Sequence, residues 1–158
     1  MTEERLNFLR ERMAQAAELN PSILALREKL LSVGGVELVV PGAIDPDIEE
    51  LVQSGSLIHG PVELYEMDES VCHENVAKLW DTNPGLLRHI GTGYALTPDG
   101  LWRQHSWGIK ADGIIVETTA LRSLYFGLML DGDRGRLLRV LQFWCLSNGA
   151  LSRLLDCR

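Results

Sequence analysis

The chain has 158 residues, of which 46% are hydrophobic and 23% are charged, a composition that suits one globular domain with a buried core. Its formal net charge is -7, and its arginines are scattered apart from a small group in residues 134–139. This argues against a nucleic-acid binder, because neutralising phosphates requires clustered cations. No segment approaches the roughly 18 apolar residues of a membrane span. We therefore expect one domain over residues 1–158, without a nucleic-acid or membrane partner.

The cysteines and the N-terminal segment point to a reducing compartment. Cys72, Cys145 and Cys157 are an odd number of cysteines and lack the spacing of a disulfide framework. Residues 1–13 carry charges of both signs instead of the apolar run of a signal peptide. We expect a cytoplasmic protein with no disulfide scaffold.

Residues 1–55 are interpreted as a helical N-terminal part. Apolar residues recur at three- and four-residue steps over residues 3–19 and again after Pro21, which predicts two helices. Asn20-Pro21 is typical of a helix start, and Gly34-Gly35 of a helix end. The two helices would pair antiparallel in their own domain, or the first would contact a second copy and support an oligomer.

A strand and a short third helix follow in the same part of the chain. Val36–Val40 is rich in β-branched residues and is closed by Pro41-Gly42, which predicts a strand. Asp45-Pro46 repeats the signal of a capping residue followed by proline, so we expect a helix that runs through Val52 and ends before Gly55.

Residues 56–120 are predicted to hold a helix and a three-stranded meander. The helix runs from Ser70 to about Trp80, and Pro61–Met67 before it is either a strand or an extended approach. The expected strands are residues 90–96, 101–109 and 114–119. Thr97–Gly100 has proline and glycine where a type I turn prefers them, and Ala111–Gly113 suits a three-residue hairpin loop with glycine in the left-handed conformation.

Residues 121–158 are assigned to C-terminal helices, with the clearest helical pattern over residues 134–155. The fold class expected from all these elements is α+β. In it, an antiparallel sheet of about four to five strands packs with helices from both ends of the chain.

The predicted helix that contains Cys72 gives this thiol a reactive position. If Ser70 caps the helix, or Asp68 in its place, Cys72 lies in the first turn. There the free N–H groups and the positive end of the helix dipole stabilise a thiolate. The same N–H groups could bind an oxyanion as it forms.

The hairpin register brings a histidine and a glutamate to one face of the sheet. With Ala111–Gly113 as the loop, Lys110 pairs with Ile114, so that His105 and Glu117 become diagonal neighbours. A loop one residue longer or shorter would separate them. In the predicted register Glu117 can orient His105 and stabilise its protonated form, as the third member of a catalytic triad does.

These residues resemble a known group of enzymes. A cysteine that begins a helix, then His105-Ser106-Trp107 in one strand, then Glu117-Thr118-Thr119 in the next, are similar in order to the transglutaminase-like and papain-like cysteine hydrolases. The resemblance covers about fifty residues. It implies a helix packed on an antiparallel sheet, with Cys72 as nucleophile, His105 as base and Glu117 as the orienting carboxylate.

We therefore expect a cysteine-dependent hydrolase or acyltransferase that acts on an amide or thioester bond of a small molecule or peptide. No organic cofactor and no metal are expected. Candidate substrate-binding residues surround the expected triad: Trp107, Trp102, Tyr94, Arg103, Gln104 and Asn75. Their competing interpretation is structural, with the aromatic residues packing the sheet and Arg103 and Gln104 lying on a solvated face.

Two alternatives of other classes stay open. In the first, the protein is a non-catalytic binding module in which Trp102, Trp107 and Tyr94 form a partner surface and Cys72 is an inert buried thiol. In the second, Cys72 and several histidines bind zinc. The histidines concerned are His59, His73, His89 and His105, although none of the usual zinc-ligand spacings is present.

Overall fold

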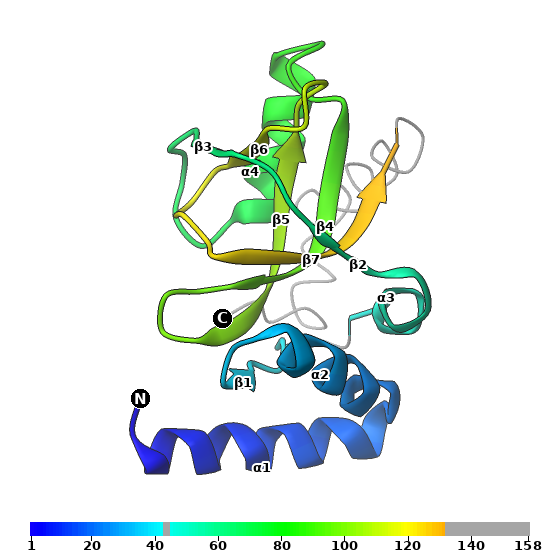
Figure 1. Ribbon diagram of the computed structural model, residues 1–158, viewed down its shortest axis with the longest axis vertical. Coiled ribbons are helices and arrows are strands. Elements are labelled where there is room, and N and C mark those ends of the chain that lie inside the picture. The colour runs from blue at the N-terminus through cyan, green and yellow to red at the C-terminus, as the bar shows by residue number, and fades with distance from the viewer. Residues whose placement is uncertain (43–44, 132–158) are drawn as a thin grey trace, which may run out of the picture.

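The computed structural model describes residues 1–42 and 45–131 and has a mixed α+β architecture (Figure 1). The helices are α1 (Glu3–Leu19), α2 (Ser22–Val33), α3 (Ile48–Ser54) and α4 (Cys72–Thr82). The strands are β1 (Glu37–Leu38), β2 (Ser56–Ile58), β3 (Val62–Leu64), β4 (His89–Leu96), β5 (Leu101–Ile109), β6 (Ile115–Glu117) and β7 (Leu124–Leu130).

The two N-terminal helices form where the sequence predicts them. The Thr2 hydroxyl oxygen accepts a hydrogen bond from the backbone N–H of Arg5 at 3.3 Å, which caps α1. The Asn20 side chain accepts one from the N–H of Ser22 at 3.1 Å at the start of α2. Gly34 ends α2 with a φ of 144°, a conformation that side-chain-bearing residues rarely adopt.

The third helix begins later than its capping signal predicts. The Asp45 carboxylate accepts a hydrogen bond from the N–H of Asp47 at 2.9 Å and another from the hydroxyl of Tyr94 at 3.1 Å. These bonds form a local turn before α3, which starts at Ile48 without a side-chain cap. Asp45 therefore ties this segment to the sheet and does not cap the helix.

Both predicted links of the meander are confirmed. Gly100 donates its N–H to the carbonyl of Thr97 at 2.9 Å and has a φ of 80°. In the second link, Gly113 donates to the carbonyl of Lys110 at 3.1 Å with a φ of 86°. The glycines supply the left-handed conformation that such turns need. The second loop fixes the pairing of Gly108 with Val116 and of Ile109 with Ile115 in β5 and β6, which is the predicted register.

The sheet is larger than predicted and not purely antiparallel. Its strand order is β2-β7-β4-β5-β6-β3, and β1 also pairs with β5. The pairs β1–β5 and β3–β6 are parallel, whereas the other pairs are antiparallel. β7 lies in the part that was assigned to C-terminal helices, so that assignment is wrong for residues 124–130. The helical pattern over residues 134–155 lies outside the described residues.

The missed strand has a physical explanation. β7 pairs with β2 on one side and β4 on the other, and its residues are mostly buried. A strand that is buried on both faces is apolar throughout, so its sequence lacks the alternation that distinguishes a strand from a buried helix. β2 is too short, at three residues, to show a period.

The helices cover one face of the sheet and one of its ends (Figure 1). α4 packs along β5, and side chains from α2, α3 and α4 share a core cluster with side chains of β4, β5 and β7. Tyr94 and Trp102 are fully buried in this cluster. Ala95, Trp107, Ile109, Ile115 and Tyr125 form a second, smaller cluster. Since neighbouring strand residues point to opposite faces, the second cluster lies across the sheet from the first.

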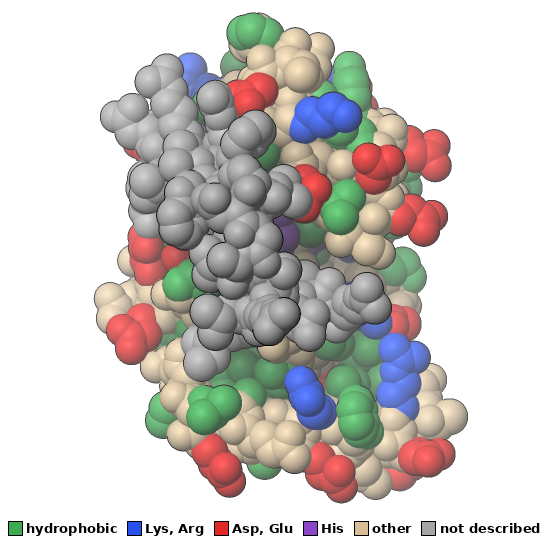
Figure 2. All heavy atoms as spheres, turned by 180° about the vertical axis from the view of Figure 1, so that it is seen from behind, with side chains coloured by type: hydrophobic (Ala, Val, Ile, Leu, Met, Phe, Trp, Pro, Cys, Tyr) green, Lys and Arg blue, Asp and Glu red, His purple; other side chains and the backbone are tan. Residues whose placement is uncertain are grey.

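The surface carries charges of both signs. On the face shown in Figure 2, acidic side chains are spread around the periphery and basic side chains lie singly between them. Among the helices of the described residues, none is long and apolar enough to cross a membrane.

A buried ion pair joins the N-terminal helices to the sheet. Arg27 of α2 donates two hydrogen bonds to the fully buried carboxylate of Glu37 in β1, at 2.6 and 2.7 Å. Burial opposes ionisation of Glu37, but the bonds from Arg27 outweigh it and lower the pKa of the carboxyl. The pair therefore stabilises the fold above the ordinary carboxyl pKa near 4.5, and this contribution is lost as the pH falls through the lowered value.

Replacing Arg27 with Met should lower the free energy of unfolding at neutral pH by about 3 kcal/mol, because Glu37 would be left buried without its main counter-charge. Arg10→Met is the matched control, since Arg10 is half-exposed and lies 4.0 Å from the same carboxylate; its effect should stay within about 0.5 kcal/mol. Urea unfolding of both variants measures the difference. Equal losses in the two variants would contradict the anchoring role of Arg27.

Candidate active site

Cys72 is the first residue of α4. The start of this helix is stabilised by backbone hydrogen bonds and by the buried side-chain amide of Asn75. The capping position is Val71, which makes no side-chain cap, so the expectation that Ser70 or Asp68 caps the helix is wrong. Ser70 has instead a φ of 64°, a rare conformation for a residue other than glycine. The Asn75 side chain donates to the carbonyl of Asp68 at 2.6 Å and so fixes the loop before Cys72.

The edge of β5 that faces Cys72 is open in its middle. Trp102 accepts a hydrogen bond from Val39 beyond β1, and Lys110 donates one to Ile114 beside β6. Even-numbered residues of β5 therefore turn their peptide groups towards this side. Ser106, between the two contacts, directs its backbone N–H to the sulfur of Cys72. The first turn of α4 thus occupies the interval between β1 and β6 along β5.

His105 and Glu117 are joined by a short, buried hydrogen bond. Nε2 of His105 lies 2.8 Å from Oε1 of Glu117 and 3.0 Å from Oε2. The His105 side chain is 4% exposed and that of Glu117 is 0% exposed. His105 is also hydrogen-bonded to Cys72. Since Nε2 faces Glu117, Nδ1 is the ring nitrogen that remains for the thiol. The structure therefore brings Cys72, His105 and Glu117 together in that order.

The carboxylate of Glu117 is surrounded by donors that keep it ionised. The Tyr125 hydroxyl donates to Oε2 at 3.0 Å, and the backbone N–H of Thr118 donates to Oε1 at 3.0 Å. The N–H of Thr119 adds a longer contact of 3.4 Å. A buried carboxylate is costly unless hydrogen bonds and an opposite charge compensate it, and here both are present.

The pKa shifts of the three groups favour a thiolate beside an imidazolium. Burial opposes the charged form of each group, but the hydrogen bonds to its neighbours outweigh burial. As a result, the pKa of the Cys72 thiol is lowered, that of His105 is raised to about 9, and that of Glu117 is lowered. A thiolate is the reactive form of cysteine and an imidazolium can donate a proton, so the arrangement can perform acyl transfer.

The directions of the pKa shifts of His105 and Glu117 define the pH range in which their charges stabilise the fold. The pKa of His105 in the folded protein lies above its ordinary value of 6.5, so its stabilisation is complete below 6.5 and is lost as the pH rises through about 9. The pKa of Glu117 lies below its ordinary value of 4.5, so its contribution is present above 4.5 and is lost as the pH falls.

The aromatic residues that were candidates for substrate binding are inside the protein. Trp102, Trp107 and Tyr94 are each 0% exposed. Trp102 donates from Nε1 to the carbonyl of Gly34 at 2.8 Å. Trp107 stacks on His105 with 6.2 Å between ring centres, so it packs against the buried side of the His105 ring. Their burial agrees with the packing interpretation and not with a substrate-facing surface.

The polar candidates are placed differently from one another. Arg103 donates two hydrogen bonds of 2.8 Å to the carboxylate of Asp99, so its guanidinium is engaged at the hairpin turn. Asn75 is 2% exposed and acts on the loop before Cys72. Gln104 is half-buried, and its place on β5 is between Trp102 and Ser106, beside the first turn of α4. Gln104 and Arg103 are both half-buried, whereas Asn75 is buried.

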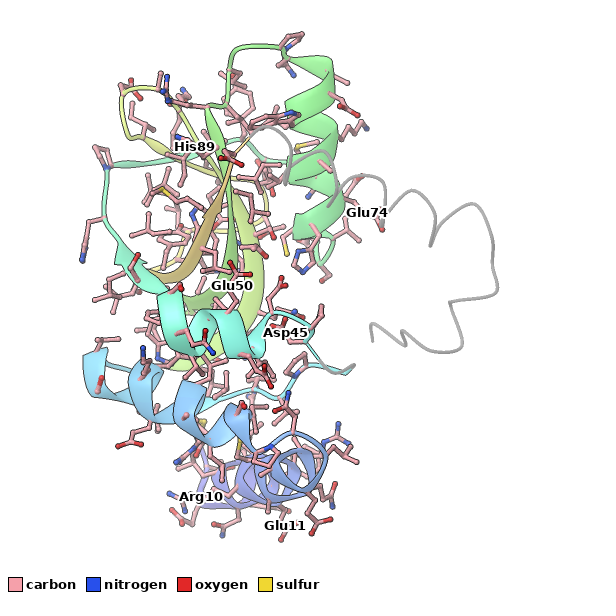
Figure 3. All side chains as sticks on the ribbon, turned by 90° about the vertical axis from the view of Figure 1, so that its right-hand side faces the viewer. Arg10, Glu11, Asp45, Glu50, Glu74 and His89 are labelled. Carbon is pink, nitrogen blue, oxygen red and sulfur yellow. The ribbon has the colours of Figure 1, made fainter. Side chains whose placement is uncertain are left out.

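The zinc alternative gains no support from the described residues. No three or more of their cysteine, histidine, aspartate and glutamate side chains are grouped so that they could hold a metal ion. His59 is exposed. His89, labelled in Figure 3, lies at the start of β4, away from the Cys72 end of α4.

Three residues of the site were not identified as functional candidates from the sequence. The sequence indicates Ser106 only through the resemblance, and His73 only as a possible metal donor. Tyr125 lies in the strand that was missed. The alternation in β5 was the available signal for Ser106, which had to face opposite to His105. No sequence pattern predicts the contact of Tyr125 with Glu117, because this contact depends on how distant strands pair.

No protein-family model, curated protein or solved structure matches this chain.

Replacing Glu117 with Gln should lower the pKa of His105 from about 9 by at least about one unit, because burial remains while the balancing charge is lost. The titration of the His105 ring, followed by NMR, measures this shift. Glu74→Gln is the matched control: Glu74 is exposed on α4 and points away from the sheet in Figure 3. A His105 pKa that is the same in both variants would contradict the assigned contact.

Proposed function

We propose that this protein is a cysteine-dependent hydrolase or acyltransferase that acts on amide or thioester bonds. Cys72 serves as the nucleophile, His105 as the acid and base, and Glu117 as the carboxylate that orients His105. The observation that carries the proposal is that His105 is hydrogen-bonded both to Cys72 and to the buried Glu117.

The reaction follows from the positions of these groups. The thiolate of Cys72 attacks the acyl carbon, a C–S bond forms, and the carbonyl oxygen takes up negative charge. The first backbone N–H groups of α4 have no partner within the helix and can stabilise that charge. The protonated His105 gives its proton to the leaving group as the bond to it breaks. In the second step a water molecule, or another nucleophile that accepts the acyl group, gives a proton to His105 and attacks the thioester. The C–S bond breaks and Cys72 leaves as a thiolate.

A purely structural explanation accounts less well for the same arrangement. A cysteine that only fills space needs apolar neighbours, whereas Cys72 receives hydrogen bonds from His105 and from the backbone of Ser106. The buried Glu117 also costs free energy that packing alone would avoid. The binding-module alternative required an exposed aromatic surface, and the burial of the three aromatic side chains removes its support.

The proposal can be tested with a small activated ester. Cys72 is 9% exposed, so p-nitrophenyl acetate is a suitable probe because it is compact. Incubation should place one acetyl group on Cys72, detected by mass spectrometry, together with a burst of p-nitrophenol. Cys72→Ala should show neither, and His105→Ala should slow the acylation by about 100-fold or more.

The other two cysteines provide an internal control in the same molecule. Cys145 and Cys157 should be acetylated at the slow rate of ordinary thiols. Acetylation of Cys72 at the same rate as these two, or at an unchanged rate in His105→Ala, would exclude the proposed mechanism.

A further inference from the structure

A second histidine contact joins the same two elements as the proposed catalytic pair. His73 follows Cys72 on α4, and Ser106 follows His105 on β5. Nδ1 of His73 lies 2.7 Å from the hydroxyl oxygen of Ser106. The backbone N–H of Ser106 reaches the sulfur of Cys72. Ser106 is therefore in contact with both residues of the first turn of α4, one through its side chain and one through its backbone.

The hydroxyl of Ser106 also contacts a neighbouring strand. The Ser106 hydroxyl is 3.3 Å from the hydroxyl oxygen of Thr92 on β4. A hydroxyl has one proton to give, so His73 donates from Nδ1 when the Ser106 proton is directed to Thr92 and accepts at Nδ1 when that proton is directed to His73. A continuous series of hydrogen bonds thus runs from His73 on α4 through Ser106 on β5 to Thr92 on β4.

His73 remains uncharged where the proposed chemistry operates. Burial, and after it the positive charge of His105, lower the pKa of His73 to about 4. An imidazole with so low a pKa is a poor general base near neutral pH. It also adds no charge that would compete with the protonated His105. A role of His73 in proton transfer is therefore disfavoured. Its hydrogen bond to Ser106 favours a role in positioning α4.

The start of α4 needs such a contact. Its capping residue, Val71, makes no side-chain hydrogen bond to the helix, and uncapped first turns are prone to fray. The bond of Asn75 to Asp68 fixes the loop before the helix but does not reach the sheet. The His73 side chain ties this turn laterally to β5 through Ser106, beside the contacts that Cys72 makes with His105 and Ser106.

We propose that His73 is a positioning residue: through Ser106 it holds the first turn of α4 against β5, so that the sulfur of Cys72 stays within reach of both His105 and the N–H of Ser106. The inference rests on the proposed function, since it explains how the reactive thiolate is maintained. It separates two histidines of one site by role, with His105 moving protons and His73 fixing geometry.

The test is the pH dependence of alkylation of Cys72 by iodoacetamide, resolved by mass spectrometry, in wild type and in four variants. These are His73→Ala, His73→Asn, Ser106→Ala and the exposed control Glu74→Gln. Thermal unfolding first confirms that each variant folds. Above about pH 5 the wild-type His73 is uncharged, so its removal leaves the local charge unchanged. A shift in the pKa of the Cys72 thiol then reports a change in the position of its sulfur relative to His105 and the N–H of Ser106.

His73→Ala should raise the apparent thiol pKa by about half a unit to one unit, which slows alkylation near pH 6 by roughly three- to tenfold. Ser106→Ala should act in the same direction. His73→Asn should recover most of the rate, because its amide N–H₂ can donate from about the position of Nδ1. Glu74→Gln should keep the wild-type profile.

His105→Ala, measured beside these variants, separates failure of this inference from failure of the proposed function. If His105→Ala raises the thiol pKa while His73→Ala does not, the positioning role is wrong and the proposed function stands. If His73→Asn is as impaired as His73→Ala, the hydrogen bond is not what positions the helix, and the inference is again overturned. If neither His105→Ala nor His73→Ala changes the profile, both proposals fail.

Discussion

The hydrogen bond between the buried carboxylate of Glu117 and Nε2 of His105 is the interaction on which the site depends. A carboxylate with no exposed surface stays ionised only if its surroundings compensate it. The charge on His105 does so, together with Tyr125 and the backbone of Thr118. The same charge lowers the pKa of the Cys72 thiol. Loss of Glu117 would therefore alter the protonation equilibria of both His105 and Cys72.

The fold serves this interaction by the way its strands meet β5. β6 pairs with β5 near the hairpin loop and β1 pairs with it near the opposite end, so the central peptide groups on that edge are free for α4. The sulfur of Cys72 approaches through this interval. Trp107 lies on the same face of β5 as His105, stacks on its ring and contacts Tyr125. A strand paired along its whole length would have left no place for the first turn of the helix.

The local part of this arrangement could be predicted from the sequence, because it depends on short-range rules. A three-residue loop ending in Gly113 determines the β5–β6 register, and the register alone places His105 and Glu117 on one face. The helix that starts near Cys72 was likewise readable from its apolar period. Both signals act within about fifteen residues of the chain.

The remainder depends on contacts that no local pattern records. β7 reads as an apolar run, and its place between β2 and β4 follows from the tertiary structure alone. The parallel pairing of β3 with β6 links residues more than fifty apart. The exact start of α4 differs from the capping signal at Ser70, because Asn75 and the β5 edge hold the helix in place of a cap. The sequence also leaves open whether Trp102 and Tyr94 pack in the core or bind a substrate. Their complete burial in the structure favours packing.

The most direct test of the account is whether Cys72 is a thiolate at neutral pH. The thiolate absorbs in the ultraviolet, so a pH titration of the absorbance difference between wild type and Cys72→Ser reports its ionisation alone. We expect a midpoint well below the value near 8.5 of an ordinary thiol, and a return towards that value in His105→Ala. A midpoint at or above 8.5 in the folded wild-type protein would contradict the thiolate–imidazolium pair and, with it, the proposed nucleophile.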